Sequence, residues 1–328
     1  MEKQWQWASA TRVKIGRTDD PEVLLGQLLP GYSNDEAVCL LVDTGGRIGL
    51  KKVNRTVEAL LRFSKPHWRL ALILECNEYW SVPASVWTLV NLEQLRLEYN
   101  NLDTLSPDIA KLVKLKKLCI GVNQFEDFPE AVCQLEQLEQ LFVSYCRLSV
   151  LPASFASLRH LRHLALTSNK FAEFPEVICE LRKLTMLHLN GNKLSSLPHS
   201  FANLRELREL DISRNCFKKF PTVLCQLSKL TILKIYSNGM RELPLAFTKL
   251  TKLSFLEVCM NEFTSIPLFL GDLPQLSNLN ATYGQFIQSP ALYCFLPLVQ
   301  AILFRARSTA SKMSDYSTTS KSVERSFD

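Results

Sequence analysis

Residues 184–198 read LTMLHLNGNKLSSLP, and this stretch decides the fold because its frame returns every 23 residues. The frame is L-x-x-L-x-L-x-x-N-x-L/F-x-x-L/F-P, where x is any residue. Its first position is occupied in turn by Arg69, Leu92, Leu115, Leu138, Leu161, Leu184, Leu207, Leu230, Leu253 and Leu276. A fixed period of this length is typical of a solenoid, in which each repeat packs on its neighbours.

The first half of the frame predicts one short strand per repeat, because apolar and polar residues alternate in it. Strands that all run in the same sense stack into a parallel sheet. We expect the asparagine that follows each strand to bond backbone groups of the turn, in its own repeat and in the next. This position holds Asn77, Asn100, Asn123, Asn169, Asn192, Asn215, Asn238 and Asn261, with Cys146 once and Gly284 at the end.

The proline that closes most copies of the frame predicts a short helix on the return segment, because its fixed φ suits a first helical turn. Bulky residues alternate along the array. Phe125 and Phe128 fill the second half of one repeat, and Phe155 fills the return segment of the next. We therefore expect bulk to be exchanged between two core positions, as close packing requires.

On this frame the chain resembles the intracellular leucine-rich repeat proteins of the 23-residue class, such as the Ras-suppressor and Scribble/Erbin type arrays. The resemblance covers about residues 69–290. It implies an α/β leucine-rich repeat solenoid, or horseshoe, with a parallel sheet on the concave face and short helices or turns on the convex face. It also implies an intracellular scaffold, and it suggests a small GTPase or a phosphatase as the partner.

The chain is predicted to have four regions. Residues 1–68 do not repeat, and they form either a cap on the first repeat or a small α/β adaptor. Residues 69–290 are about ten repeats. Residues 291–305 are expected to be a closing helix, with a membrane-associating tail acylated at Cys294 as the alternative. Residues 306–328 are rich in serine and threonine and are expected to be disordered.

Within residues 1–68 the pattern predicts two helices and a strand. The first helix is expected near 21–29 and the strand near 37–42. A turn at Gly45-Gly46 follows, and then a second helix over about 56–63, with Asn54 as its cap.

Composition and cysteine usage favour the cytoplasm. None of the ten cysteines belongs to a cluster at the ends of the array, and Cys133, Cys179 and Cys225 share one repeat position as small core residues. The first 20 residues lack the apolar stretch of a signal peptide. The longest apolar stretch is shorter than the roughly 20 residues of a membrane helix. The net charge of +6 is modest and does not indicate nucleic acid as a partner.

No motif of a known catalytic site occurs in the chain, which is therefore not expected to be an enzyme or to hold a cofactor. Nucleophile elbow, P-loop, kinase and HExxH patterns are all missing. His163 and His188 lie in adjacent repeats, but no third ligand shares their phase. A metal site is not expected for this reason.

The x residues of the strands are expected to form a binding surface on the concave face, because the core does not need them. They include many aromatic, methionine and histidine side chains, which protein interfaces favour. The alternative is that some of these aromatics pack only on one another across strands. The predicted partner-binding residues are Tyr99, Phe142, Tyr145, His163, Met186, His188, Asp211, Arg214, Tyr236 and Phe255.

Three functions remain open from the sequence. The first is a non-enzymatic scaffold or adaptor that binds a protein partner in intracellular signalling. The second is a substrate-recruiting subunit of a ubiquitin ligase or phosphatase, with residues 1–68 docked on the enzyme. The third is a peripheral membrane adaptor that uses a basic column beside the frame's first position. This column contains Lys114, Lys116, Arg159, Arg162, Arg182, Lys183, Arg205, Arg208, Lys229, Lys249 and Lys252.

Overall fold

The computed structural model describes residues 11–15, 19–28, 39–43, 49–63, 68–264 and 267–281. The chain divides into two compact units, Met1–Asn192 and Lys193–Asp328. The predicted Gly45-Gly46 turn, closing helix 291–305, tail 306–328 and acylated Cys294 all lie outside the described residues, as does Gly284.

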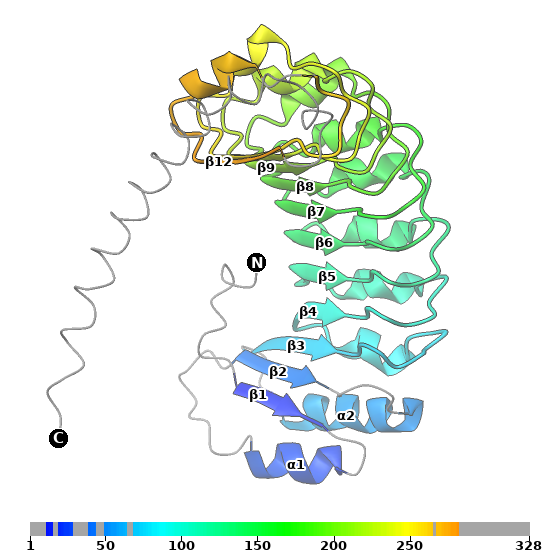
Figure 1. Cartoon of the computed structure of the whole chain (residues 1–328). Coiled ribbons are helices and arrows are strands. Elements are labelled where there is room, and N and C mark those ends of the chain that lie inside the picture. Colours follow the sequence, from blue (N-terminus) through cyan, green and yellow to red (C-terminus); the bar gives the residue numbers. More distant parts are fainter. Residues whose placement is uncertain are drawn as a thin grey trace, which may run out of the picture. The chain divides into compact units, whose positions relative to one another are not determined.

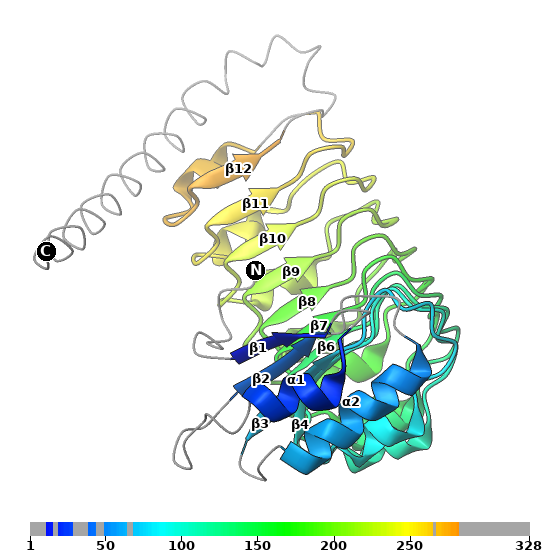
Figure 2. The ribbon, with the colours of Figure 1, turned by 90° about the horizontal axis from the view of Figure 1, so that it is seen from below.

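Parallel strands follow one another in chain order within each unit (Figures 1 and 2). The first unit contains β1 (Thr11–Lys14), β2 (Cys39–Asp43), β3 (Arg69–Ile73), β4 (Leu92–Arg96), β5 (Lys117–Cys119), β6 (Gln140–Phe142), β7 (His163–Ala165) and β8 (Met186–His188). The second contains β9 (Glu209–Asp211), β10 (Ile232–Lys234), β11 (Phe255–Glu257) and β12 (Asn278–Asn280). The structure therefore confirms the predicted leucine-rich repeat solenoid with its parallel sheet.

The leucines of the frame set the register of the sheet. Leu118 pairs with Leu141, Leu141 with Leu164, and Leu164 with Leu187, so each step is one whole repeat. All four side chains are buried. Because a strand's side chains alternate between its two faces, the residues on either side of each leucine lie on the opposite, open face of the sheet.

Short 3-10 helices form the return segments, where a short helix was predicted. Their bounds are η3 (Ala84–Thr88), η4 (Pro107–Lys111), η5 (Glu130–Gln134), η6 (Ala153–Ser157), η7 (Glu176–Glu180), η8 (His199–Asn203), η9 (Thr222–Gln226), η10 (Leu245–Lys249) and η11 (Leu268–Asp272). Pro129 is typical: it precedes η5 as the cap, and its carbonyl accepts from the Val132 N–H at 2.9 Å. Five residues are too few for a stable α-helical run.

The predicted exchange of bulk between core positions is confirmed. The rings of Phe128 and Phe155 meet edge to face, with centroids 5.1 Å apart. Phe220 and Phe247 repeat this contact at 5.3 Å in the second unit. Such pairs add about 0.5–1.5 kcal/mol to the free energy gained from burial.

The segment before the repeats continues the sheet and carries full α-helices. Helix α1 (Pro21–Leu28) matches the predicted first helix, and β2 matches the predicted strand. Strand β1, which pairs with β2, was not predicted, since its sequence TRVK has only one apolar residue. Helix α2 (Leu50–Phe63) begins earlier than predicted, because the carbonyl of Gly49 accepts from the N–H groups of Lys52 and Val53.

Asn54 is therefore not the cap of α2, as predicted, but lies inside the helix. Its Oδ1 accepts a hydrogen bond from the Ser85 hydroxyl at 2.6 Å, which ties α2 to η3. Helix α2 also has an apolar face, since Val53, Val57 and Leu60 are fully buried. Spacings of three and four residues place these side chains on one face of the helix.

The first repeat departs from the regular register. Leu70 pairs with Leu92, but Ala71 pairs with Gln94, so the register shifts between them. Arg69, which occupies the leucine position of the frame, instead forms an ion pair with Glu93 at 2.7 Å. Trp68 and Leu70 on either side of it are buried. The charged side chain thus turns outward while its neighbours fill the core.

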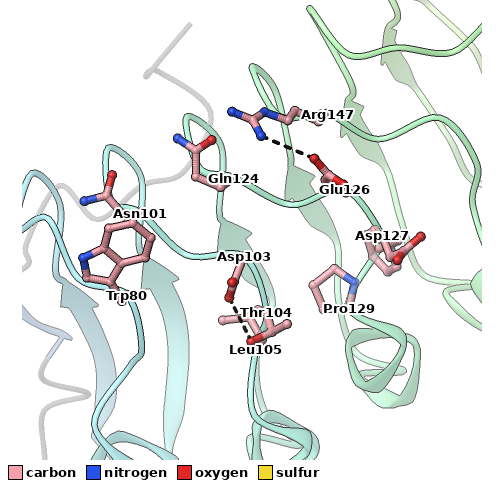
Figure 3. A pocket seen from close by; sticks show the side chains of 11 residues that line it. Trp80, Asn101, Asp103, Thr104, Leu105, Gln124, Glu126, Asp127, Pro129 and Arg147 are labelled. Carbon is pink, nitrogen blue, oxygen red and sulfur yellow. Dashed lines mark hydrogen bonds and ion pairs between the residues drawn. The ribbon is translucent and has the colours of Figure 1, made fainter.

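Backbone hydrogen bonds connect the flanks of successive repeats, beyond the asparagine position. The N–H of Asn101 donates to the carbonyl of Tyr79, that of Gln124 to Leu102, and that of Arg147 to Phe125. Figure 3 shows Asn101, Gln124 and Arg147 side by side on this flank. The flank is therefore held at a fixed spacing from repeat to repeat.

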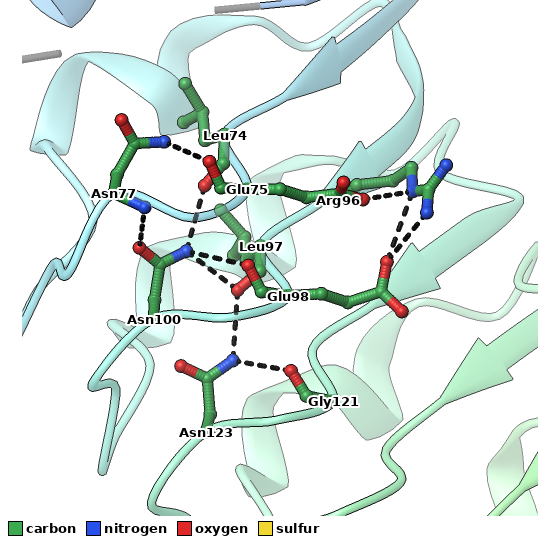
Figure 4. A network of polar contacts seen from close by, with 9 residues as sticks. All are labelled: Leu74, Glu75, Asn77, Arg96, Leu97, Glu98, Asn100, Gly121 and Asn123. Atoms are coloured by element: carbon green, nitrogen blue, oxygen red, sulfur yellow. Dashed lines mark hydrogen bonds and ion pairs between the residues drawn. The ribbon is translucent and has the colours of Figure 1, made fainter. Parts of the chain in front are cut away.

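The asparagine side chains form a second ladder, which runs in the direction opposite to the one predicted (Figure 4). The amide of Asn123 donates to the carbonyls of Ile120 and Gly121 in its own repeat, and to that of Leu97 in the preceding repeat. Its oxygen accepts from the N–H of Leu102, also in the preceding repeat. The predicted bonds within the asparagine's own repeat are confirmed, whereas those to the following repeat are wrong, because the side-chain amide reaches backbone groups of the preceding repeat instead.

Candidate functional site

The open face of the first unit gathers four of the predicted binding residues on three successive strands, with a fifth in the turn after one of these strands. Phe142 lies on β6, His163 on β7, and Met186 and His188 on β8, while Tyr145 lies in the turn after β6. His163 pairs in register with Met186. Because neighbouring strands are ~4.8 Å apart, the group spans roughly 10 Å. We call these five residues the central cluster.

The central cluster is partly ordered by contacts to the strands beside it. The side-chain amide of Gln140 lies 2.9 Å from Nδ1 of His163, and Gln140 itself is buried. If the amide donates, the His163 proton is on Nε2, which faces away from the amide. The ammonium of Lys117 lies 5.5 Å from the centre of the Phe142 ring, within cation–π range. These contacts hold the side chains of His163 and Phe142 in place before any partner binds.

Two tyrosines project from the rim of this face with more than half of their surface exposed. Tyr99 is 58% exposed and Tyr145 is 59% exposed. Both have a φ of 57°, and the residues at this position in the neighbouring repeats also have positive φ. A left-handed residue directly before the asparagine is thus a property of the turn, and most residue types bear some strain there. The identity of the side chain is left free by the fold.

The second unit holds the other predicted residues, and their surroundings differ. Asp211 is buried, and its Oδ1 accepts a hydrogen bond from the Ser213 N–H at 3.0 Å, so this carboxylate stabilises the turn after β9. The guanidinium of Arg214 lies 5.7 Å from the centre of the Tyr236 ring. Partial burial raises the pKa of Tyr236, and Asp211 adds to this shift. Phe255 is half-buried on β11.

Sequence reasoning missed an ion-pair network on the open face near the start of the repeats (Figure 4). Nε of Arg96 lies 2.5 Å from Glu75, and the same guanidinium lies 3.0 Å from Glu98. Burial opposes the charge of Arg96, but the two carboxylates outweigh it and raise its pKa. Glu75 and Glu98 occupy the same repeat position, two residues beyond that of Arg96. This spacing was the signal that could have revealed the network.

The predicted basic column is neutralised at several points. Lys116 pairs with Glu93 at 3.2 Å, and Lys229 pairs with Glu206 at 2.6 Å. Lys114 donates to the side-chain oxygen of Asn91. Ion pairs at this exposure add little stability, but they lower the positive field that a membrane surface would meet.

The described residues offer little acid–base or metal chemistry. No group of three or more histidine, cysteine or acidic side chains in them could hold a metal ion. Burial raises the pKa of the Cys119 thiol to about 12 and that of Cys146 to about 11, so both stay protonated at neutral pH. In the described part of the chain, no helix is long and apolar enough to cross a membrane.

Known proteins share the repeat and its fold. The leucine-rich repeat family matches residues 90–148, 136–194 and 182–240. A leucine-rich repeat protein of Leptospira interrogans is 23% identical, with 84% of this chain and 78% of that chain covered and a TM-score of 0.64. The internalin InlF of Listeria monocytogenes is 17% identical, with 85% and 83% covered and a TM-score of 0.62.

A plant peptide hormone receptor, RGFR1 in complex with RGF2, is also similar. It is 17% identical, with 74% of this chain and 47% of that chain covered and a TM-score of 0.54. No curated protein sequence matches the chain. These findings support a leucine-rich repeat protein. At such low identities the structural likeness shows the fold alone, and this fold is typical of protein-interaction modules.

Proposed function

We propose that this protein is a non-enzymatic interaction scaffold that binds a protein or peptide partner on the open face of its sheet. The observation that carries the proposal is the central cluster, where aromatic, methionine and histidine side chains from three successive strands share one face. The frame requires leucine at the buried positions of these strands, but it accepts any residue at the positions of the central cluster. A solvated sheet has no need of such residues, whereas interfaces are enriched in them.

The cluster also has the layout of a binding surface. Tyr145 stands exposed at its rim, while Phe142, His163, Met186 and His188 are half-buried around it. Side chains that are already held by Gln140 and Lys117 lose less conformational entropy when a partner binds. Among proteins of this fold, the plant receptor in complex with RGF2 is a precedent for a bound partner.

The finer assignment rests on the 23-residue frame. It supports an adaptor of the intracellular class that acts in the cytoplasm in signal transduction, with a small GTPase or a phosphatase as the expected partner. The identity of the captured protein decides between them.

The test is affinity capture from an extract of the source cells, read by mass spectrometry, with wild type and Tyr145→Ala/His163→Ala/Met186→Ala compared side by side. We expect at least one partner to be lost with the triple variant. A matched control, Ser149→Ala/Val150→Ala/Glu173→Ala, removes three exposed side chains from the second half of the frame in the same unit and should keep that partner.

Both variants are first checked for unchanged thermal unfolding. Partners that the triple variant keeps at wild-type levels would refute the proposal. Equal loss from both variants would do the same, because binding would then not depend on the open face. A captured ubiquitin ligase complex would favour the recruiting subunit over the scaffold.

A further inference from the structure

A groove lies on the flank of the first unit, away from the central cluster, and its chemistry is unlike that of the open face. It has a volume of about 680 Å³ and is lined by side chains of successive repeats, including Trp80, Asp103, Leu105, Glu126, Asp127 and Phe128 (Figure 3). We call it the flank groove. Leu105 and Phe128 are buried and form its floor, while the three acidic side chains are exposed.

Trp80 is the most exposed large apolar side chain at this groove, with 72% of its surface accessible. It lies at one end of the groove, and Asp127 lies at the other (Figure 3). Figure 3 also shows Asp103 and Glu126 between them. An indole face combined with carboxylates is the arrangement that binds guanidinium and ammonium groups, through cation–π contact and ion pairing.

The groove already holds one such cation from the protein itself. Arg147 forms an ion pair with Glu126 at 3.3 Å, and both side chains are at least half exposed. The hydroxyl of Thr104 donates to Asp103, and Asp127 makes no ion pair among the described residues. The groove therefore has three carboxylates for one guanidinium, and it keeps a negative charge.

The repeat supplies an internal comparison, because most of the same positions, although not that of Trp80, line a groove of about 710 Å³ in the second unit. Glu126 and Asp127 correspond, four repeats later, to Lys218 and Lys219. Phe128 corresponds to Phe220, which is also buried. The geometry is shared and the charge is reversed, so the solenoid itself does not require acidic residues at the flank groove.

We propose that the flank groove binds a cationic segment of a partner protein, with arginine or lysine side chains held by Trp80 and the carboxylates of Asp103 and Asp127. The lining residues span four repeats, or roughly 15 Å at the spacing of parallel strands. An extended segment of about four to five residues covers this length. The interaction is distinct from the one proposed for the open face and uses different residues.

The test is fluorescence anisotropy with the full chain and a labelled six-residue peptide of alternating serine and arginine, at low and at 0.5 M salt. We expect binding at low salt that weakens when salt screens the charges. We expect Trp80→Ala/Asp103→Asn/Asp127→Asn to weaken it about tenfold, as loss of one cation–π contact and two exposed ion pairs implies.

Two controls distinguish binding in the flank groove from binding elsewhere on the protein and from general attraction to its exposed carboxylates. Glu173→Gln/Glu180→Gln removes two exposed carboxylates outside the groove, with Glu173 at the same repeat position as Asp127, and should change affinity less than twofold. The Tyr145→Ala/His163→Ala/Met186→Ala variant should also keep peptide binding, so that failure of one proposal leaves the other standing. Absence of binding at low salt, or equal loss from the Glu173 control, would overturn the inference.

Discussion

At the asparagine position, one side chain joins backbone groups of two repeats that would otherwise be unpaired. Asn169 donates to the carbonyls of Val143 and Leu166, and its oxygen accepts from the N–H of Leu148. Such a buried amide is hard to replace, since a lost partner leaves a polar group without a hydrogen bond. The pattern predicted the residue type and its burial, but it could not predict which neighbouring repeat the amide contacts.

Cys146 occupies this position in one repeat and makes weaker hydrogen bonds there than asparagine does. Its sulfur lies 3.8 Å from the Ile120 carbonyl and 3.7 Å from the Ser144 carbonyl, which are weak contacts for a thiol. We predict that Cys146→Asn raises the free energy of unfolding by about 1–2 kcal/mol, because an amide restores the missing donors and acceptor. Urea denaturation followed by circular dichroism measures the change.

The reciprocal variant is the control for this prediction. Asn169→Cys places a thiol at the same position in the next repeat and should lower stability by about the same 1–2 kcal/mol. If both substitutions destabilise the protein, the space around Cys146 does not accept an amide and the ladder is not simply interrupted there.

At the scale of the elements, strands and helices were predicted correctly where the sequence pattern that specifies them is strong. The strands from β4 to β12 and the return segments were predicted because the same frame specifies each of them. Strand β1 was missed because four residues cannot show alternation. The start of α2 was wrong because glycine, and not serine, threonine, aspartate or asparagine, precedes Leu50. The 3-10 form of the return segments follows from their length, which the frame alone does not reveal.

The backbone of a neighbouring repeat limits side-chain size in the turn after β5, where Gly121 lies. A Cβ at Gly121 would lie 2.7 Å from the carbonyl oxygen of Ser144, a backbone atom of the next repeat. We predict that Gly121→Ala lowers the free energy of unfolding by about 1–3 kcal/mol, because two repeats must move apart. Thermal unfolding measures the loss.

Gly239 is the matched control, because it also lies in a turn but has room. A Cβ there would come no closer than 3.6 Å to any neighbour. Gly239→Ala should therefore change stability by less than about 1 kcal/mol, in either direction. A similar loss in both variants would mean that backbone freedom, and not the approach of Ser144, sets the requirement at Gly121.

At the scale of the molecule, the parts of the surface that suggest function are those that the repeat does not determine. The central cluster could be proposed from the sequence because strand positions of a known frame fall on one face. The flank groove could not, since Trp80, Asp103 and Asp127 lie outside the strands, in the second half of the frame, and the groove that they line forms only when the repeats stack. Likewise, the sequence could not show that Asp211 is buried and accepts a hydrogen bond from the Ser213 N–H in its turn.

The segment before the repeats is the remaining question at this scale, because it can be a cap or a separate adaptor. Strand β2 pairs with β3 over five residues, and α2 packs on η3 through Asn54 and Ser85. These contacts favour a cap. We predict that Val57→Asp, which puts a charge on the buried face of α2, lowers stability by about 3 kcal/mol and exposes the first repeats.

Hydrogen exchange read peptide by peptide tests this prediction, because it reports local opening in each element. With Val57→Asp, the amides of β3 and β4 should lose protection together with those of α2. Leu61→Asp is the control, since Leu61 is on the same helix but is 51% exposed, and it should leave all three elements protected. Rapid exchange confined to α2, with β3 and β4 unchanged, would instead indicate an adaptor that folds apart from the array.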